Sequence, residues 1–276
     1  MMGRSHSLSG AGIFLVGAAV YQQATQTQLD PAVLAMGTIV FAGAALAPDM
    51  DSYTATVTKS FSFIGRILYH VANVIGLFFY NISRTKYDEP ITNGHRTFFH
   101  TGISAILMGS LVALATAAQG QTPIMGKDYS WGEIFALIIV AFCLQVSLAG
   151  IFQKQLKDAK KGFGPFILAA VSITGTVILS RFMPDPDAAG TYSWLGIAFG
   201  VGWLVHILGD LITKMGVPLF WPLKIKGHRW YDVSLPSFMR ISAGGTFENV
   251  FLVPLFYVMI FGGLIWNILI ILHVIK

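Results

Sequence analysis

Six long, nearly uncharged apolar runs constrain this chain more than any other feature of its sequence. They cover about residues 31–47, 98–118, 132–152, 163–183, 194–216 and 249–272. Each is long enough, or nearly so, to cross a hydrocarbon core about 30 Å thick as a helix. The runs are continuous rather than alternating, which argues against membrane-spanning strands. Only 11% of the residues are charged, whereas a soluble protein has about a quarter. We therefore predict an all-α integral membrane protein.

Two further segments are ambiguous. Residues 8–21 are apolar but short, and they predict either a span or a signal peptide with Arg4 as its basic end. No strong cleavage site follows, which favours a span. Residues 61–82 are apolar but contain three polar side chains (Arg66, His70 and Asn73). Such a polar face suits an interfacial or re-entrant helix better than a lipid-facing span. We predict a polytopic transmembrane helix bundle of about seven spans plus this one interfacial or re-entrant helix.

The distribution of lysine and arginine predicts the orientation. With seven spans, one side of the membrane holds fifteen of the 18 lysines and arginines, and the other side holds only Lys127, Arg181 and Lys276. The rich side should be cytoplasmic, and it includes the N-terminus. If residues 61–82 also crossed, and Arg66 lay inside that span, the split would be twelve to five, which is a weaker bias. The basic excess therefore reflects membrane topology, and we expect no nucleic-acid partner.

The chain shows no internal repeat, so we predict one integral-membrane domain over residues 1–276. Its longest connection, residues 217–248, contains Trp221, His228, Arg229 and Trp230 and predicts a structured cap on the cytoplasmic side. The run "KQLKDAKK" at 154–161 predicts a solvated cytoplasmic turn. The single cysteine, Cys143, excludes an intrachain disulfide and a cysteine-based metal cluster.

Several ionisable residues lie at or inside the apolar runs, where they are costly and therefore candidates for function. His6 precedes the apolar segment 8–21. Asp49 and Asp51 follow the run at 31–47 in "LAPDMDS", where Pro48 should end the helix near Ala47. A spacing of two places both carboxylates on one side of an extended segment. They predict either a cap for the next helix or a cation site.

A second group opens the run at 98–118, in the stretch "HRTFFHT". His95 and His100 are five residues apart, which does not place them on one helical face. They can act together if His95 lies in the approach to the helix and His100 in its first turn. Imidazole is a common metal ligand, and the Arg96 guanidinium suits a phosphate or carboxylate. The alternative is an interfacial anchor of basic and aromatic residues.

A third group lies in the run at 194–216. His206 and Asp210 are four residues apart, on one face of the expected helix. They predict metal ligation or a histidine oriented by a carboxylate, with a structural polar contact between helices as the alternative. Glu248 begins the last run and suits either the site or the positive end of a helix dipole.

In the seven-span arrangement all of these groups meet near the cytoplasmic face. Histidines with several carboxylates suit zinc or another divalent transition metal, as one or two ions. We assign metal binding to His6, Asp49, Asp51, His100, His206 and Asp210. His95 is then a ligand or a general acid–base group, Arg96 binds phosphate, and Glu248 is a ligand or a second base.

The same motifs resemble those of a family of bacterial inner-membrane proteins, the YdjM-like, LexA-regulated, membrane-bound metal-dependent hydrolases. The matching residues are His6, "PDMD" (48–51), "HRTFFH" (95–100), "HILGD" (206–210) and "TKMGVPLFWPL" (213–223). The resemblance implies a polytopic, metal-dependent hydrolase of the bacterial cytoplasmic membrane. The ligand pattern also looks distantly like that of zinc phospholipase C and related nucleases, which act on phosphodiesters. Residues 119–193 lie outside these motifs.

The leading hypothesis is a membrane-embedded metal-dependent hydrolase, phosphoesterase-like, that acts on a lipid or lipid-linked phosphate at the cytoplasmic interface. A transporter for a divalent cation or protons could use the same residues. The outer half of the expected bundle has almost no ionisable residue except Glu133, which disfavours a path through it. A scaffold with a structural metal is a third hypothesis. The sequence predicts no oligomeric state.

Overall fold

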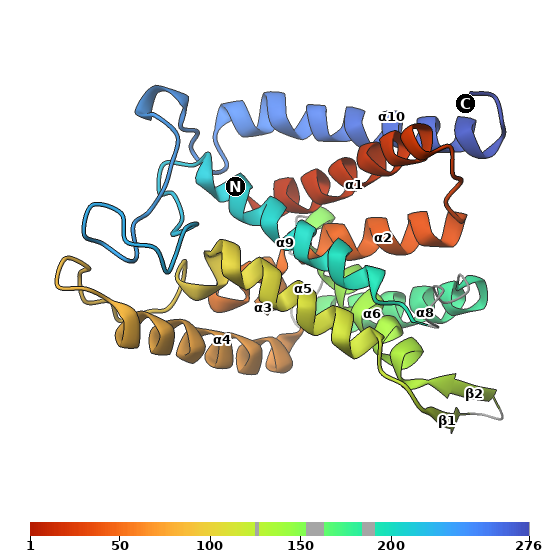
Figure 1. Ribbon diagram of the computed structural model, residues 1–276, viewed down its shortest axis with the longest axis horizontal. Helices are drawn as coiled ribbons and strands as arrows, with labels where there is room; N and C mark the ends of the chain where they lie inside the picture. The colour runs from red at the N-terminus through yellow and green to blue at the C-terminus, as the bar shows by residue number, and fades with distance from the viewer. Residues whose placement is uncertain (125–126, 153–162, 184–190, 276) are drawn as a thin grey trace.

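The computed structural model describes residues 1–124, 127–152, 163–183 and 191–275, as a bundle of helices (Figure 1). The α-helices are α1 (Gly3–Thr25), α2 (Pro31–Ala44), α3 (Thr56–Ser60), α4 (Ser62–Ser83), α5 (Gly102–Thr116), α6 (Trp131–Ile151), α8 (Gly164–Leu179), α9 (Trp194–Leu211) and α10 (Val253–Ile271). Short helical turns are η1 (Ala47–Asp51), η2 (Phe98–His100), η3 (Ser180–Phe182), η4 (Ser237–Met239) and the π-helical η5 (Glu248–Leu252). Strands β1 (Gln121–Ile124) and β2 (Lys127–Ser130) pair antiparallel in a hairpin that the sequence did not predict.

The prediction of an all-α, multi-pass membrane bundle is confirmed. Six helical segments in the described ranges are long and apolar enough to cross a membrane: Pro31–Asp51, Ser62–Ser83, Trp131–Ile151, Gly164–Phe182, Trp194–Leu211 and Glu248–Ile271. Helix α5 is a shorter apolar helix. It begins later than the apolar run at 98–118 because the Thr101 hydroxyl accepts the backbone N–H of Ser104 and caps the helix there.

Alternating helix directions collect the candidate residues at one end of the bundle. The N-terminal ends of α1, α5 and α10 lie at the left of Figure 1, together with the C-terminal end of α9. The β-hairpin and the C-terminus lie at the opposite end. Two basic residues belong to the first end, because Arg4 lies in the first turn of α1 and Arg96 contacts Asp210 near the end of α9. Which end faces the cytoplasm stays a prediction, and the stretch 154–161 lies outside the described residues.

Helix α4 has one apolar face that is exposed and one that is packed. Phe63, Ile67, Val74 and Phe78 are 47–70% exposed, at helical spacing. The packed face carries small residues, and the segment 84–97 runs back along it. Tyr80 donates a hydrogen bond to the carbonyl oxygen of Glu89 at 2.5 Å, and an added Cβ on Gly76 would lie 2.7 Å from the carbonyl oxygen of Gly94.

The return segment decides how α4 relates to the membrane. It brings His95 back to Asp51, 2.7 Å away. The chain therefore leaves the bundle before α4 and rejoins it after residue 97 at the same place. An α4 that crossed the bilayer would need this non-helical segment to cross back, with its backbone groups in lipid, which is strongly unfavourable. The geometry therefore fits the predicted interfacial or re-entrant helix, lying with its apolar stripe toward lipid.

Glycines allow the helices that carry the candidate residues to pack closely. An added Cβ on Gly10 of α1 would lie 2.8 Å from the carbonyl oxygen of Phe41 in α2, and one on Gly202 of α9 would lie 2.7 Å from the same atom. Close packing through small residues is a common way for membrane helices to associate. It fixes the positions of α1, α2 and α9 relative to one another, one helical turn or two from the ionisable residues at their ends.

Candidate metal centre

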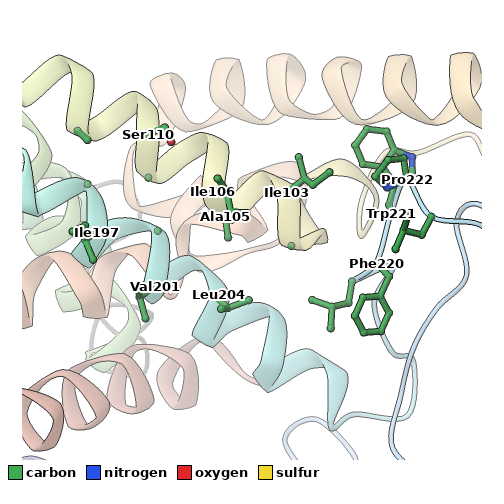
Figure 2. Close-up of a pocket in the computed structure, with 17 residues that line it drawn as sticks. Ile103, Ala105, Ile106, Ser110, Ile197, Val201, Leu204, Phe220, Trp221 and Pro222 are labelled. Carbon is green, nitrogen blue, oxygen red and sulfur yellow. The ribbon is translucent and has the colours of Figure 1, made fainter.

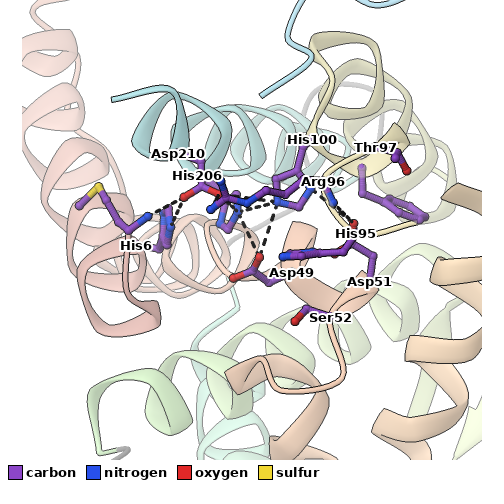
Figure 3. Close-up of polar contacts among 12 residues, drawn as sticks. His6, Asp49, Asp51, Ser52, His95, Arg96, Thr97, His100, His206 and Asp210 are labelled. Atoms are coloured by element: carbon purple, nitrogen blue, oxygen red, sulfur yellow. Dashed lines mark hydrogen bonds and ion pairs between the residues drawn. The ribbon is translucent and has the colours of Figure 1, made fainter. Parts of the chain in front are cut away.

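Residues from four distant parts of the chain meet in one polar cluster (Figure 3). They come from α1, from the turn η1, from the segment through η2 and from the end of α9. The residues are His6, Asp49, Asp51, His95, Arg96, His100, His206 and Asp210. His100 closes η2, rather than lying in the first turn of α5 as the sequence predicted. The indole of Trp203 holds this turn in place by donating to the carbonyl oxygen of Phe99 at 2.9 Å.

Four side-chain atoms of the cluster lie at separations near those of ligands that share one metal ion. The Nε2 atoms of His100 and His206 are 3.3 Å apart. Each lies 3.6 Å from Oδ1 of Asp49 and 3.9 Å from Oδ2 of Asp210. Tetrahedral ligands at zinc–ligand bonds of 2.0–2.2 Å are separated by about 3.4 Å. The separation of the two Nε2 atoms is close to this value, and the four nitrogen–oxygen separations are wider.

A hydrogen bond orients one histidine of this quartet, and a carboxylate contact orients the other. The Nδ1 atom of His206 donates to the carbonyl oxygen of Ala45 at 2.9 Å, so its Nε2 carries the lone pair. The Nδ1 atom of His100 lies 3.4 Å from Oδ2 of Asp51. A carboxylate or carbonyl behind a ligating histidine is the usual way to fix its tautomer and orientation. Both rings thus present Nε2 to the same space.

Asp51 is fully buried and contacts three groups at once. Its Oδ1 accepts the Nδ1 proton of His95 at 2.7 Å, and its Oδ2 accepts the backbone N–H of Arg96 at 3.2 Å and faces His100. The carboxylate therefore orients both histidines of the "HRTFFH" motif. It also leaves Nε2 of His95 as the ring nitrogen with no proton to donate when the ring is neutral.

His6 packs beside the quartet. Its ring stacks on His206 with centroids 4.0 Å apart, and its Nε2 lies 3.2 Å from Oδ1 of Asp210. Among the described residues neither ring nitrogen of His6 has a partner in hydrogen-bonding geometry, nor has Nδ1 of His100. Buried polar atoms are rarely left in this state. These donors without partners, in a set of imidazoles and carboxylates, fit a bound divalent metal.

The cluster divides into two groups of donor atoms, each with its atoms within 4.8 Å of one another. One group is Asp49, Asp51, His95 and His100, and the other is His6, His206 and Asp210. They meet where His100 faces His206. The arrangement can therefore hold one ion in the quartet or two ions, one in each group.

Asp210 has two cationic neighbours, one at each carboxylate oxygen. Its Oδ1 lies 2.5 Å from the α-amino group of Met1, and its Oδ2 lies 2.8 Å from Nη2 of Arg96. Arg96 itself has a left-handed backbone (φ 59°), which is costly for a residue with a side chain. The Asp51 carboxylate and the Gly216 carbonyl oxygen, 3.4 Å from Nη1, hold the residue in this conformation.

The cluster opens on one side only. The side chains of His6, His100, His206 and Asp210 are 0–2% exposed, whereas those of Asp49, Arg96 and His95 are 23%, 18% and 30% exposed. Arg96 and His95 line a cavity of about 700 Å³ whose wall includes Thr97, Gly216 and Asp232. A small polar molecule in this cavity would therefore reach the cluster past Arg96 and His95.

The sequence did not predict two acidic residues that shape the cavity. Asp232 lines it, where partial loss of solvent raises the pKa of its carboxyl to about 6 and the Arg96 charge opposes that rise. Asp88 is buried and accepts the backbone N–H groups of Thr85, Arg229 and Trp230. Burial would raise the pKa of Asp88, but these hydrogen bonds outweigh it and keep that pKa below its usual value. Asp88 thereby joins the 84–97 segment to the 217–248 connection.

Glu248 does not join the metal cluster. It is fully buried, and its two carboxylate oxygens accept the backbone N–H groups of Met2 at 2.7 Å and of Gly244 at 2.8 Å. It is absent from both groups of donor atoms that could hold an ion within the described ranges. Its contacts are those of a carboxylate that fastens the start of α1 to the start of α10.

Comparison with protein-family models identifies one match, the family described as YdjM inner membrane protein, over residues 1–153 and 164–275. Neither the curated proteins nor the solved structures contain a match. The family match covers nearly the whole chain, including every residue of the cluster, and its description agrees with the apolar helices. The chain belongs to the YdjM inner membrane protein family.

Proposed function

We propose that this protein is a membrane-embedded, metal-dependent hydrolase that acts on a phosphoester of a lipid or lipid-linked substrate. The observation that carries the proposal is the quartet of donor atoms from His100, His206, Asp49 and Asp210, next to Arg96, which contacts Asp210 and lines a polar cavity. A catalytic zinc site keeps a coordination position for water, so water would have to enter as a fifth ligand beside the quartet. The proposed metal is zinc, as one or two ions.

A bound zinc ion would act as a Lewis acid and lower the pKa of a coordinated water to about 7. Arg96 and His95 would bind the substrate and transfer protons. Arg96 lies at the mouth of the cluster, where its guanidinium can neutralise a phosphate oxygen. His95 lines the same cavity, and Asp51 holds its Nδ1 proton. Its Nε2 can therefore accept a proton from water or deliver one to a leaving group.

The orientation is part of the proposal. The end of the bundle with the cluster also carries most of the described basic residues, so we place it and the N-terminus at the cytoplasmic face. A site at that level meets phospholipid headgroups. The described core beyond the cluster is built from apolar side chains such as Met36, Val40, Val140 and Leu195. That core gives no support to a relay of ionisable groups for a transporter.

The test is metal analysis and hydrolysis by the purified full-length protein. The panel comprises phospholipids and polyprenyl phosphates, and the variants are His206→Ala and Asp210→Ala. Leu208→Ala is the matched control, because Leu208 lies between them on α9 and is 45% exposed. We expect bound zinc and metal-dependent release of phosphate or an alcohol in the wild type and in Leu208→Ala, with at least a hundredfold loss of rate in the other two.

Two results would reject the enzyme. One is a wild-type protein that retains no metal and whose activity on every substrate equals that of both variants. The other is ion flux in liposomes that both variants abolish, without any hydrolysis, which would favour a transporter. Full metal occupancy with no exchangeable water and no activity would favour a structural metal.

A further inference from the structure

A second cavity, apolar and about 770 Å³ in volume, lies between α5 and α9 (Figure 2). Ile103, Ile106 and Ser110 of α5 line one side, and Ile197, Val201 and Leu204 of α9 line the other. Its volume is within the range of ligand sites, about 300–1,000 Å³. From Gly102 to Ala113 it follows α5 for about 16 Å, which is enough for most of an acyl chain.

The groove exists because glycines bring the two helices together beneath it. An added Cβ on Gly109 would lie 2.8 Å from the carbonyl oxygen of Gly196 and 3.0 Å from the Cα atom of Gly200. The helices therefore touch along their backbones at these positions, and no side chain fills the space above. The larger side chains on either side form the walls.

The groove ends at the same segment that borders the polar cavity. Gly216 and Pro218 line the polar cavity, and the next residues along the chain, Leu219 to Leu223, line the groove. The carbonyl oxygen of Leu219 accepts the N–H of Gly102 at 2.9 Å, which fixes the segment to the start of α5. The two cavities thus adjoin across residues 216–223. One is polar, with Arg96 beside Asp88, Glu89 and Asp232, and the other is apolar.

We propose that the groove binds one hydrocarbon chain of an anionic membrane lipid whose phosphate occupies the polar cavity beside Arg96. This inference deepens the proposed function, on which it rests, by naming the part of the substrate that the groove recognises. The argument is the Arg96 guanidinium, which can pair with a phosphate at one end, and the apolar wall of the groove at the other. Met215 and Phe220 are 69% and 49% exposed, and they border the polar cavity and the groove respectively. They provide apolar surface between the two.

The test uses a hexadecyl phosphate that carries a photoreactive diazirine in its chain, with the equivalent hexadecanol as the uncharged control. Labelled peptides are mapped in the full-length protein, in wild type and in Ser110→Trp, which fills the groove. The matched control is Leu111→Trp, because Leu111 is the next residue, is 58% exposed and lies outside the groove. Ile106→Trp and Leu107→Trp form a second such pair, and thermal unfolding checks that all variants fold.

We expect the phosphate probe to label α5 and α9 at the groove in wild type and in Leu111→Trp. Labelling in Ser110→Trp should be at least fivefold lower, and the alcohol probe should label all proteins weakly. Equal labelling of Ser110→Trp and Leu111→Trp, or equal labelling by the alcohol, would overturn the inference. Labelling requires no hydrolysis, so labelling without activity rejects only the proposed function. Hydrolysis of short-chain and long-chain phosphoesters alike, unchanged in Ser110→Trp, rejects only the lipid groove.

Discussion

The Nε2 atoms of His100 and His206 lie 3.3 Å apart, although 106 residues separate them in the chain. The Ala45 carbonyl behind one ring and the Asp51 carboxylate behind the other make both nitrogens face the same space. Two buried lone pairs that face each other repel, unless a proton or a metal ion lies between them. The pair is therefore the centre of the candidate site.

Replacing His100 with Ala should remove the metal. The change takes one donor from a quartet whose remaining atoms belong to three other residues, and no nearby side chain on η2 can substitute. We expect bound metal, measured by mass spectrometry of the purified protein, to fall below one tenth of the wild-type amount. Full occupancy in His100→Ala would show that the metal lies elsewhere.

Asp51→Asn should weaken metal binding without reducing the number of ions. In a one-ion site Asp51 orients His100 and His95 and touches no ion, and loss of such a partner typically costs about 10- to 100-fold in affinity. Competition with a fluorescent chelator measures the change, and Asp49→Asn, which removes a quartet oxygen, should cost more. Loss of one ion of two in Asp51→Asn would instead assign Asp51 as a ligand in a two-ion site.

The sequence predicts the helices well because a membrane leaves few choices for a long apolar run. It also predicts His100 as a metal ligand, and it leaves His95 as either a ligand or an acid–base group. It does not predict Ala45 as a partner of His206, because any residue can offer a carbonyl. Nor does it predict Asp88 and Asp232, whose roles depend on how two loops fold against each other. The sequence could not assign the role of Glu248, because an acidic residue at the start of a helix gives the same sequence pattern whether it binds a metal or backbone N–H groups.

Gly209→Ala should weaken metal binding even though alanine favours helices. An added Cβ at Gly209 would lie 3.0 Å from Cε1 of His6, so the imidazole must shift away from Asp210. Helix propensity alone would stabilise the protein by up to about 1 kcal/mol. The control is Gly17→Ala on α1, where an added Cβ meets nothing within 4 Å. We expect lower metal affinity and no gain in Tm for Gly209→Ala, and a gain in Tm with unchanged metal for Gly17→Ala.

Glu248→Gln should lower stability and leave the metal in place. Glutamine offers one accepting oxygen, so either the N–H of Met2 or that of Gly244 loses its partner, at a cost of about 1–3 kcal/mol. Thermal unfolding and metal analysis of the same sample separate the two effects. A variant that loses metal but keeps its Tm would restore Glu248 to the ligand set.

Asp232 should make anion binding in the polar cavity depend on pH near 6. Its pKa is raised to about 6, so the carboxyl is mostly neutral below that pH and negative above it. A negative charge near Arg96 opposes an anion by about 1 kcal/mol in water, which is roughly a fivefold change in affinity. A phosphodiester keeps one charge across this range, so its binding should weaken as pH rises from 5 to 7.5. In Asp232→Asn the part of this pH dependence that is due to Asp232 should be absent. The difference between the wild-type and variant titrations therefore separates the effect of Asp232 from that of other groups. Identical pH profiles for the two proteins would show that Asp232 does not influence the anion site.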